Sequence, residues 1–241
     1  MEDAPVKPEA LDAVVFDVIG TLVDEDATWA SAAARIAAET GSDGTVDLLA
    51  GWAAALDLRM SAVVEGDEPW RPHRELVVES ARAAVSTAGG ELTAADAAQL
   101  AEIEAGYPAW PDVASATAAL RRNRLVAGLS NGDLDSLARL ANTNRISWDI
   151  ALSTGSVRTF KPAPAAYRHA IDALRIEPTR TLFVAAHPWD LRAAAAFGFR
   201  TAYIARPGAE RPSKDDRFDL QLEDLDALVD YLDGGDPRRP L

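Results

Sequence analysis

The sequence predicts a doubly wound α/β fold: a parallel sheet with helices on both faces and a long helical insertion after the first strand. Two observations lead to this expectation. Short, continuous apolar runs alternate with helical patterns over most of the chain, and one stretch of about 80 residues lacks such a run. Strands that are apolar at every position are covered on both faces, as in a parallel sheet. Right-handed crossovers then distribute the connecting helices over the two faces.

The predicted strands and helices alternate in order along the chain. The strands are residues 13–17, 125–129, 148–152, 181–185 and 201–204. The helices that belong to this series are residues 133–143, 163–174, 189–197 and 223–232. Pro162 stands near the start of the second of these helices and Gly198 directly after the third, which is typical of helix boundaries.

Residues 26–108 interrupt the series with long alanine-rich helical patterns. We therefore expect a core domain formed by residues 1–25 and 109–241, and a helical cap domain formed by residues 26–108. Ligands of open α/β sheets bind outside the carboxyl ends of the strands. Because the insertion leaves just after the first strand, the cap is expected to cover that site. Residues 1–11 and 234–241 are expected to be frayed ends.

The composition excludes several classes of function. The chain of 241 residues is 48% hydrophobic and carries 24 Lys and Arg against 38 Asp and Glu, a net charge of −14. This charge argues against nucleic acid or an anionic membrane as partner, although a local cationic pocket can still bind a small anion. The absence of Cys excludes disulfides, thiolate metal sites and cysteine nucleophiles. With no bilayer-length apolar run and no signal-peptide pattern at the start, we expect a cytoplasmic protein.

Polar residues that could take part in a reaction stand at the predicted strand tips or at helix starts. Asp17 ends the first strand, Ser130 and Asn131 follow the second, Lys161 precedes Pro162, and Asp190 lies at a helix start. Each has an ordinary interpretation as a turn, a cap or a surface charge. Their joint order is what indicates a site, because the carboxyl ends of parallel strands meet at one edge of the sheet.

With these residues the sequence resembles the haloacid dehalogenase superfamily and, within it, the 2-haloacid dehalogenase branch. The segments that carry the resemblance are FDVIGTLVD at 16–24, LSNGD at 129–133, FKPAPAAY at 160–167 and VAAHPWDLRAAAAFGFRTAYIARP at 184–207. They span nearly the whole core, with room for a cap after the first. The resemblance implies a Rossmann-like core, no cofactor and, by analogy with the branch, a homodimer.

Ile19 separates this chain from the phosphatases of that superfamily, which carry a second Asp two residues after the nucleophile. Ile cannot transfer a proton to a leaving alkoxide. The fourth motif also offers a single acid, Asp190, where phosphatases usually place a pair for the metal. Mg²⁺ prefers several hard oxygen ligands, so we expect no metal site. The branch usually has an aromatic residue at the position of Ile19, from which this chain departs.

The resemblance implies an (S)-2-haloacid dehalogenase-like hydrolase that uses covalent catalysis on short 2-haloalkanoic acids such as haloacetate or 2-halopropionate. Asp17 would attack the halogen-bearing carbon and release halide, and water would then cleave the ester. Lys161 would keep Asp17 ionised, since a nearby cation lowers a carboxylate pKa. Ser130 and Asn131 would hold the substrate carboxylate, and Asp190 would orient Lys161 or the hydrolytic water.

His187 stands where the branch often has a water-holding Asn, and some members have His. It is interpreted either as a turn residue or as the general base of ester cleavage. Glu25, eight residues after Asp17, is a candidate to orient His187, although an acid at this point is often simply solvated.

The resemblance also implies a cation in the cap: in the 2-haloacid dehalogenase branch, a Trp-Arg pair supplies a positive charge for the halide or the carboxylate. Trp52 matches the Trp, but Ala53 follows it. Arg59 and Arg71 are the candidate substitutes, each with an alternative as a surface charge.

Three hypotheses stay open at this point: a metal-independent 2-haloacid dehalogenase, a phosphatase-like hydrolase of the same superfamily, and a binding protein that keeps the fold without turnover. Ile19 and Ala53 motivate the last. Halide release from haloacids, compared with hydrolysis of para-nitrophenyl phosphate, separates them.

Overall fold

The computed structural model describes residues 8–40 and 44–234. The ends expected to be frayed, 1–11 and 234–241, lie mostly outside this part of the chain, but Pro8–Ala10 form a 3-10 helix and Leu11 is buried, so residues 8–11 are not frayed. Within the described residues, six strands form one sheet in the order β3-β2-β1-β4-β5-β6, and every neighbouring pair is parallel. The strands are β1 (Ala13–Asp17), β2 (Leu125–Ser130), β3 (Ile150–Ser153), β4 (Thr181–Ala185), β5 (Arg200–Ile204) and β6 (Leu220–Leu222). The predicted fold class is confirmed.

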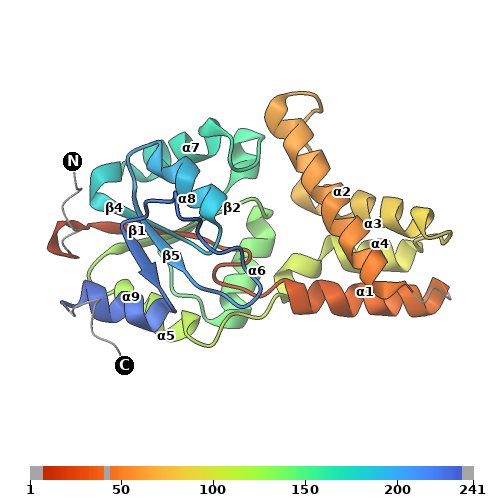
Figure 1. Cartoon of the computed structure of the whole chain (residues 1–241), viewed down its shortest axis with the longest axis horizontal. Coiled ribbons are helices and arrows are strands. Elements are labelled where there is room, and N and C mark those ends of the chain that lie inside the picture. The colour runs from red at the N-terminus through yellow and green to blue at the C-terminus, as the bar shows by residue number, and fades with distance from the viewer. Residues whose placement is uncertain (1–7, 41–43, 235–241) are drawn as a thin grey trace.

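The helices of the core cover both faces of this sheet (Figure 1). They are α5 (Val113–Leu120), α6 (Leu134–Asn144), α7 (Pro164–Leu174), α8 (Pro188–Ala195) and α9 (Leu225–Leu232). Two of the core elements, β6 and α5, were not predicted. A strand of three residues is too short for an apolar run to stand out, and α5 consists mostly of small residues with little contrast between its faces.

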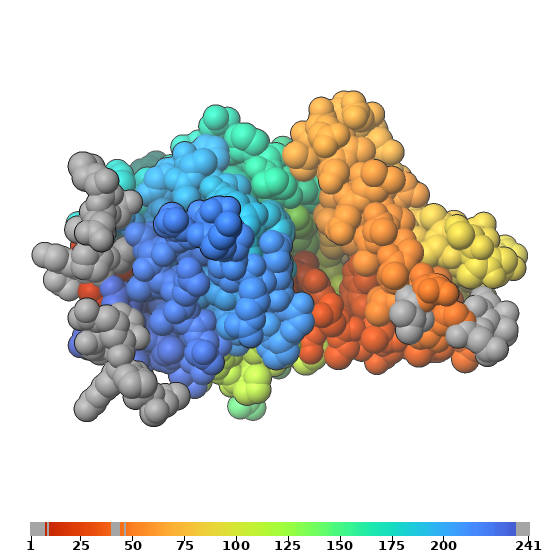
Figure 2. All heavy atoms as spheres, in the orientation of Figure 1, coloured from red at the N-terminus to blue at the C-terminus, as the bar shows by residue number. Residues whose placement is uncertain are grey.

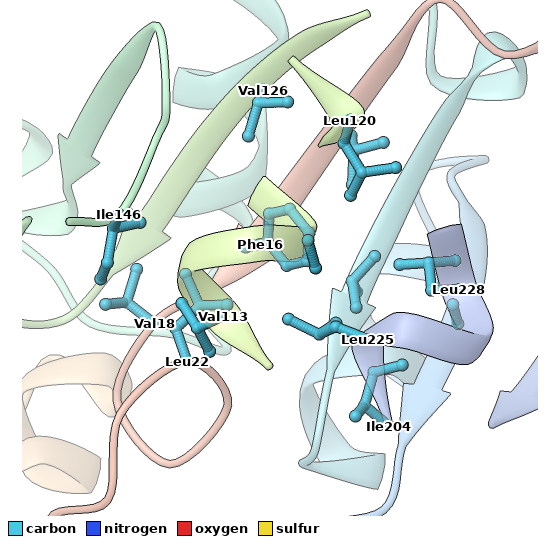
Figure 3. Packing of buried hydrophobic residues seen from close by; sticks show 14 of the residues in the cluster. Phe16, Val18, Leu22, Val113, Leu120, Val126, Ile146, Ile204, Leu225 and Leu228 are labelled. Atoms are coloured by element: carbon cyan, nitrogen blue, oxygen red, sulfur yellow. The ribbon is translucent and has the colours of Figure 1, made fainter. Parts of the chain in front are cut away.

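Alternating residues of the strands enter two separate clusters. Phe16 and Val126 pack with α5, α6 and α9 on one face, where Val113, Leu225 and Leu228 close around Phe16 (Figure 3). Val15 and Phe183 point to the other face and pack with α7 and α8. Burial on both sides explains the continuous apolar runs in the sequence. Strand β1 lies in the interior of the sheet, hydrogen-bonded to both β2 and β4.

The segment between β1 and α5 forms a helical lobe beside the sheet (Figure 1). Its helices are α1 (Asp26–Thr40), α2 (Thr45–Glu65), α3 (His73–Thr87) and α4 (Ala94–Ala101). They enclose a hydrophobic cluster of their own, which contains Trp52, Leu76 and Leu100. Phe160, from the core, is buried in that same cluster and anchors the lobe to the sheet domain next to Lys161.

A second anchor joins the two parts through charges. Arg74 in α3 donates from its backbone N–H (3.1 Å) and its Nε (2.7 Å) to the Asp133 carboxylate at the start of α6. Arg74 also contacts Asp135 and Ser136 of α6. The hollow between the helical lobe and the core, visible beside α2 in Figure 2, opens directly over the carboxyl edge of the sheet.

Candidate active site

The cavity at this edge has a volume of about 530 Å³ and lies where the strand tips meet the helical lobe. From the core it is lined by Asp17, Ser130, Asn131, Lys161 and His187. Asp17 is the last residue of β1, Ser130 ends β2, and His187 follows β4 by two positions. The shared register of the parallel strands brings these side chains to one place.

Three donors surround the Asp17 carboxylate, which is 4% exposed. Lys161 Nζ donates to Oδ1 at 2.6 Å, Thr21 Oγ1 donates to Oδ2 at 2.7 Å, and His187 Nδ1 lies 2.8 Å from Oδ2. Thr21 is itself fixed, because its hydroxyl accepts the Ala186 N–H at 2.8 Å. The carboxylate is therefore held from both oxygens.

Electrostatics keep this carboxylate ionised. Burial alone would raise the pKa of Asp17, but the charge of Lys161 and the hydrogen bond of His187 outweigh burial and hold the pKa below its usual range. Asp17 is consequently an anion at neutral pH, although its side chain is buried. A carboxylate that is ionised and fixed in one orientation is a competent nucleophile.

Lys161 is shared between two buried carboxylates. Its Nζ also donates to Asp190 Oδ2 at 2.5 Å, and Tyr167 donates from its hydroxyl to Asp190 Oδ1 at 2.5 Å. Burial lowers the pKa of Lys161 by itself, yet the two carboxylates outweigh it and the pKa is raised. Asp190 thus orients the ammonium of Lys161 towards Asp17, and the reaction centre is supported from α7 and α8.

His187 lies directly over the turn that follows β1. Gly20 has a φ of +79°, and a Cβ at this position would stand 2.6 Å from His187 Cε1. A side chain at residue 20 would displace the ring. Burial lowers the pKa of His187, but the hydrogen bond and charge of Asp17 outweigh it, so that the pKa is raised.

Glu25 lines the same cavity without a hydrogen bond to His187 among the described contacts. Its negative charge still acts on His187 and raises the pKa of that ring. Burial, chiefly, raises the pKa of Glu25 to about 7, opposed by the positive charge of His187. The structure therefore places Glu25 near His187 as an electrostatic neighbour rather than a hydrogen-bonded orienting group.

At the tip of β2, hydrogen bonds inside the protein occupy the acceptor atoms and leave donors towards the cavity. Asn131 Oδ1 accepts from Lys161 N (2.7 Å) and Thr154 Oγ1 (3.2 Å), and Ser130 Oγ accepts from Gly132 N (3.1 Å). Within the described residues, the Asn131 Nδ2 and the Ser130 hydroxyl hydrogen have no acceptor. This arrangement suits a bound anion.

The helical lobe contributes a mostly apolar wall. Leu49, Ala53, Leu56 and Met60 recur at helical spacing along α2, with Asp57 among them. Ile19 adds an apolar side chain from the core, in the position where phosphatases have an acid.

Trp52 and Arg59, both candidates for substrate binding, do not line this cavity. Trp52 is buried, stacks on Trp29 with ring centroids 4.2 Å apart, and donates its indole N–H to Val77 O in α3. Arg59 follows Trp52 by seven residues, about two helical turns, and so lies on the same side of α2. Arg71 forms ion pairs with Glu68 and Glu79 and does not line the cavity either.

Four residues of the cavity and its support were not singled out from the sequence: Thr21, Tyr167, His73 and Tyr107. Thr21 and Tyr167 lie inside the motifs that carry the resemblance, and their spacing from Asp17 and Lys161 was the signal available. Tyr107 accepts the indole N–H of Trp29 at 2.6 Å. His73, at the start of α3, and Tyr107, near the end of the insertion, reach the cavity from places where the local sequence pattern carries no such signal.

Residues 8–40 and 44–234 lack the features of two other kinds of site. No group of three or more His, Asp or Glu side chains in these ranges has the arrangement of a metal site. In the same ranges, no helix combines the length and the hydropathy that crossing a bilayer requires.

A family model described as haloacid dehalogenase-like hydrolase matches residues 11–198. The chain is 32% identical over 204 residues to an (S)-2-haloacid dehalogenase of Xanthobacter autotrophicus, covering 82% of this chain and 76% of that protein. It is 31% identical over 126 residues to haloacetate dehalogenase H-2 of Moraxella sp. (strain B), covering 51% of this chain and 56% of that protein.

The match to the first three curated relatives spans about half of their length. Among solved structures, a crystal structure of an L-2-haloacid dehalogenase superposes with a TM-score of 0.84 at 29% identity, covering 93% of this chain and 100% of that chain. The similarity therefore includes both the sheet and the helical lobe.

Proposed function

The chain belongs to the haloacid dehalogenase-like hydrolases, in their 2-haloacid dehalogenase branch, and we propose that it hydrolyses short 2-haloalkanoic acids to 2-hydroxy acids through an ester of Asp17. The observation that carries the proposal is the state of Asp17: a buried, ionised carboxylate, fixed by Lys161 and Thr21, facing a cavity with an apolar wall.

In the first step the Asp17 carboxylate attacks the carbon that bears the halogen. A carbon–oxygen bond forms, and the carbon–halogen bond breaks with its electron pair leaving as halide. No proton moves in this step, so Ile19 in place of an acid is compatible with it. Holding the carboxylate against the carbon supplies acceleration, up to roughly 7–11 kcal/mol for ideal positioning.

In the second step water attacks the carbonyl carbon of the Asp17 ester and His187 takes its proton. The alcohol oxygen leaves with that proton as the 2-hydroxy acid, and Asp17 returns as a carboxylate after releasing one proton to solvent. The raised pKa of His187 depends on the Asp17 anion. Esterification removes that negative charge, so the pKa of His187 falls when a base is needed.

The test is halide release from chloroacetate, bromoacetate, fluoroacetate and both enantiomers of 2-chloropropionate, with and without excess EDTA. We expect release from at least one 2-haloacid at a rate that EDTA does not change. Para-nitrophenyl phosphate with Mg²⁺ serves as the parallel substrate. Mg²⁺-dependent phosphate release without halide release would contradict the proposal in favour of a phosphatase, and turnover of neither class would favour a binding protein.

A further inference from the structure

The positive charges that line the cavity are unequally available to a ligand. Within the described lining they are Lys161, His187 and His73. Lys161 is bonded to Asp17 and Asp190, and His187 is bonded to Asp17, so both are engaged with the reaction centre. Asp26 and Asp57 line the same space, as does Glu25, which is partly ionised at neutral pH because its pKa is about 7. These negative charges oppose binding of an anion, so a further cation would favour an anionic substrate.

His73, the first residue of α3, is 5% exposed and rigidly held. Its Nδ1 is hydrogen-bonded to Glu104, and its ring packs edge-on against Phe160 with centroids 6.0 Å apart. The second oxygen of Glu104 accepts the Asp133 N–H at 3.3 Å. Within the described part of the chain Nε2 has no hydrogen-bond partner, so a donor remains on a ring that lines the cavity.

The His73–Glu104 pair stands against the tip of β2. Glu104 Oε2 lies 3.1 Å from the position that a Cβ on Gly132 would occupy, and Ser130 Oγ lies 3.4 Å from the same position. The pair is thus next to Ser130 at the tip of β2. His73, Ser130 and Asn131, each with a donor that no described residue accepts, all line the same cavity.

We propose that the His73 imidazolium binds the carboxylate of the substrate, together with the Ser130 hydroxyl and the Asn131 side-chain amide. The nature of the ligand rests on the proposed function, whereas the anion site itself rests on these contacts. His73 is then the residue through which this chain selects a haloacid over a neutral haloalkane.

The charge state of His73 supports this role. Burial lowers the pKa of His73, but the adjacent Glu104 carboxylate outweighs burial, and Asp133 and Glu25 act in the same direction, so the pKa is raised. A raised pKa keeps the ring positively charged at neutral pH. Anion affinity is therefore present at neutral pH and is lost as the pH rises through the pKa of His73.

The test measures binding of propionate, an unreactive carboxylate, by titration calorimetry to the full chain. His73→Gln should weaken binding about 10- to 100-fold, the value of a hydrogen bond to a charged group. His169→Gln, the same change at a histidine of α7 outside the cavity, is the control and should change nothing. Unchanged propionate affinity in His73→Gln, or no propionate binding by the unaltered protein, would overturn the inference. Bromide is titrated in the same way. If His73→Gln lost bromide binding and kept propionate binding, the inference would be overturned in favour of a halide site.

Glu104→Gln separates the charge of His73 from a structural role. Without the carboxylate partner the pKa of His73 falls, so propionate binding should be weak at about pH 8 and recover at about pH 6. Equally weak propionate binding at both pH values would contradict the inference.

In turnover, His73→Gln should raise KM for chloroacetate and leave KM for the neutral chloroacetamide unchanged. An equal rise in KM for both substrates would contradict the inference too. Propionate binding that depends on His73 in a protein that releases no halide would refute the proposed function and leave the anion site standing.

Discussion

The two walls of the cavity are built in different ways. On the core side, the polar groups stand at strand tips or in the loops and helix starts that follow them, and each is tied to another: Lys161 to Asp17 and Asp190, Thr21 to Asp17 and to the Ala186 N–H. On the side of the helical lobe, α2 presents Leu56, Met60 and other apolar side chains, and the exposed Asp57 has no hydrogen bond among the described residues. The core wall is organised for one reaction, and the α2 wall shapes the space for the substrate.

Substitutions on the core wall should therefore abolish steps of the reaction, whereas substitutions on the α2 wall should alter the affinity for the substrate.

The largest effect is expected at Asp17. Asp17→Asn should fold normally and lose halide release by several orders of magnitude, because a neutral amide is a poor nucleophile. Asp12→Asn, at an exposed residue directly before the opposite end of β1, is the matched control and should retain the activity. Halide release is measured by ion chromatography and folding by circular dichroism. Retained activity in Asp17→Asn would remove Asp17 from its role.

His187 should separate the two halves of the reaction. In His187→Ala the steady-state rate should fall about 100- to 10,000-fold, the usual contribution of a general base. One halide per site should still be released, followed by a stalled ester visible as a mass increase of the intact protein. In the unaltered protein the steady state should fall as the pH drops through the pKa of His187 in the ester, with little change in the first halide.

His169→Ala serves as the control for this variant. Loss of the first halide together with the steady state would instead make His187 a positioning group, and Asp190 would become the candidate base.

A small effect of opposite sign is expected on the α2 wall. Asp57→Asn should lower KM for a haloacid by up to about 5-fold, since an exposed charge next to an anion costs at most about 1 kcal/mol. The rate at saturation should not change. Asp47→Asn, an exposed residue of the same helix that does not line the cavity, is the control. A fall in kcat for Asp57→Asn would mean that α2 takes part in the reaction itself.

The same difference between the walls explains what could be predicted from the sequence. Asp17, Ser130 and His187 are attached to strands by at most two residues, so the predicted strands also predicted where these side chains meet. Their hydrogen bonds follow from strand order and register, which the alternation of apolar runs and helical patterns indicated.

The α2 wall could not be predicted in this way. Helix α2 is apolar on more than one side, so the sequence does not fix whether Trp52 or Ala53 turns towards the cavity. That rotation depends on the packing of Trp52 against Trp29 and α3. His73 and Glu104 are 31 positions apart and meet because the lobe folds back on itself. No local pattern carries such a contact, and the same holds for the anion site proposed here.

The central claim, that Asp17 is esterified and regenerated, is tested most directly by a single turnover in water enriched in ¹⁸O. Enzyme in excess over chloroacetate completes one turnover and is then digested with a protease. The mass of the peptide that contains Asp17 is measured by mass spectrometry. Because water attacks the carbonyl carbon of the ester, the account predicts ¹⁸O in the Asp17 carboxylate and an unlabelled hydroxy acid after the first turnover. Label in the hydroxy acid with an unlabelled Asp17 would show direct attack of water on the substrate and would contradict the account.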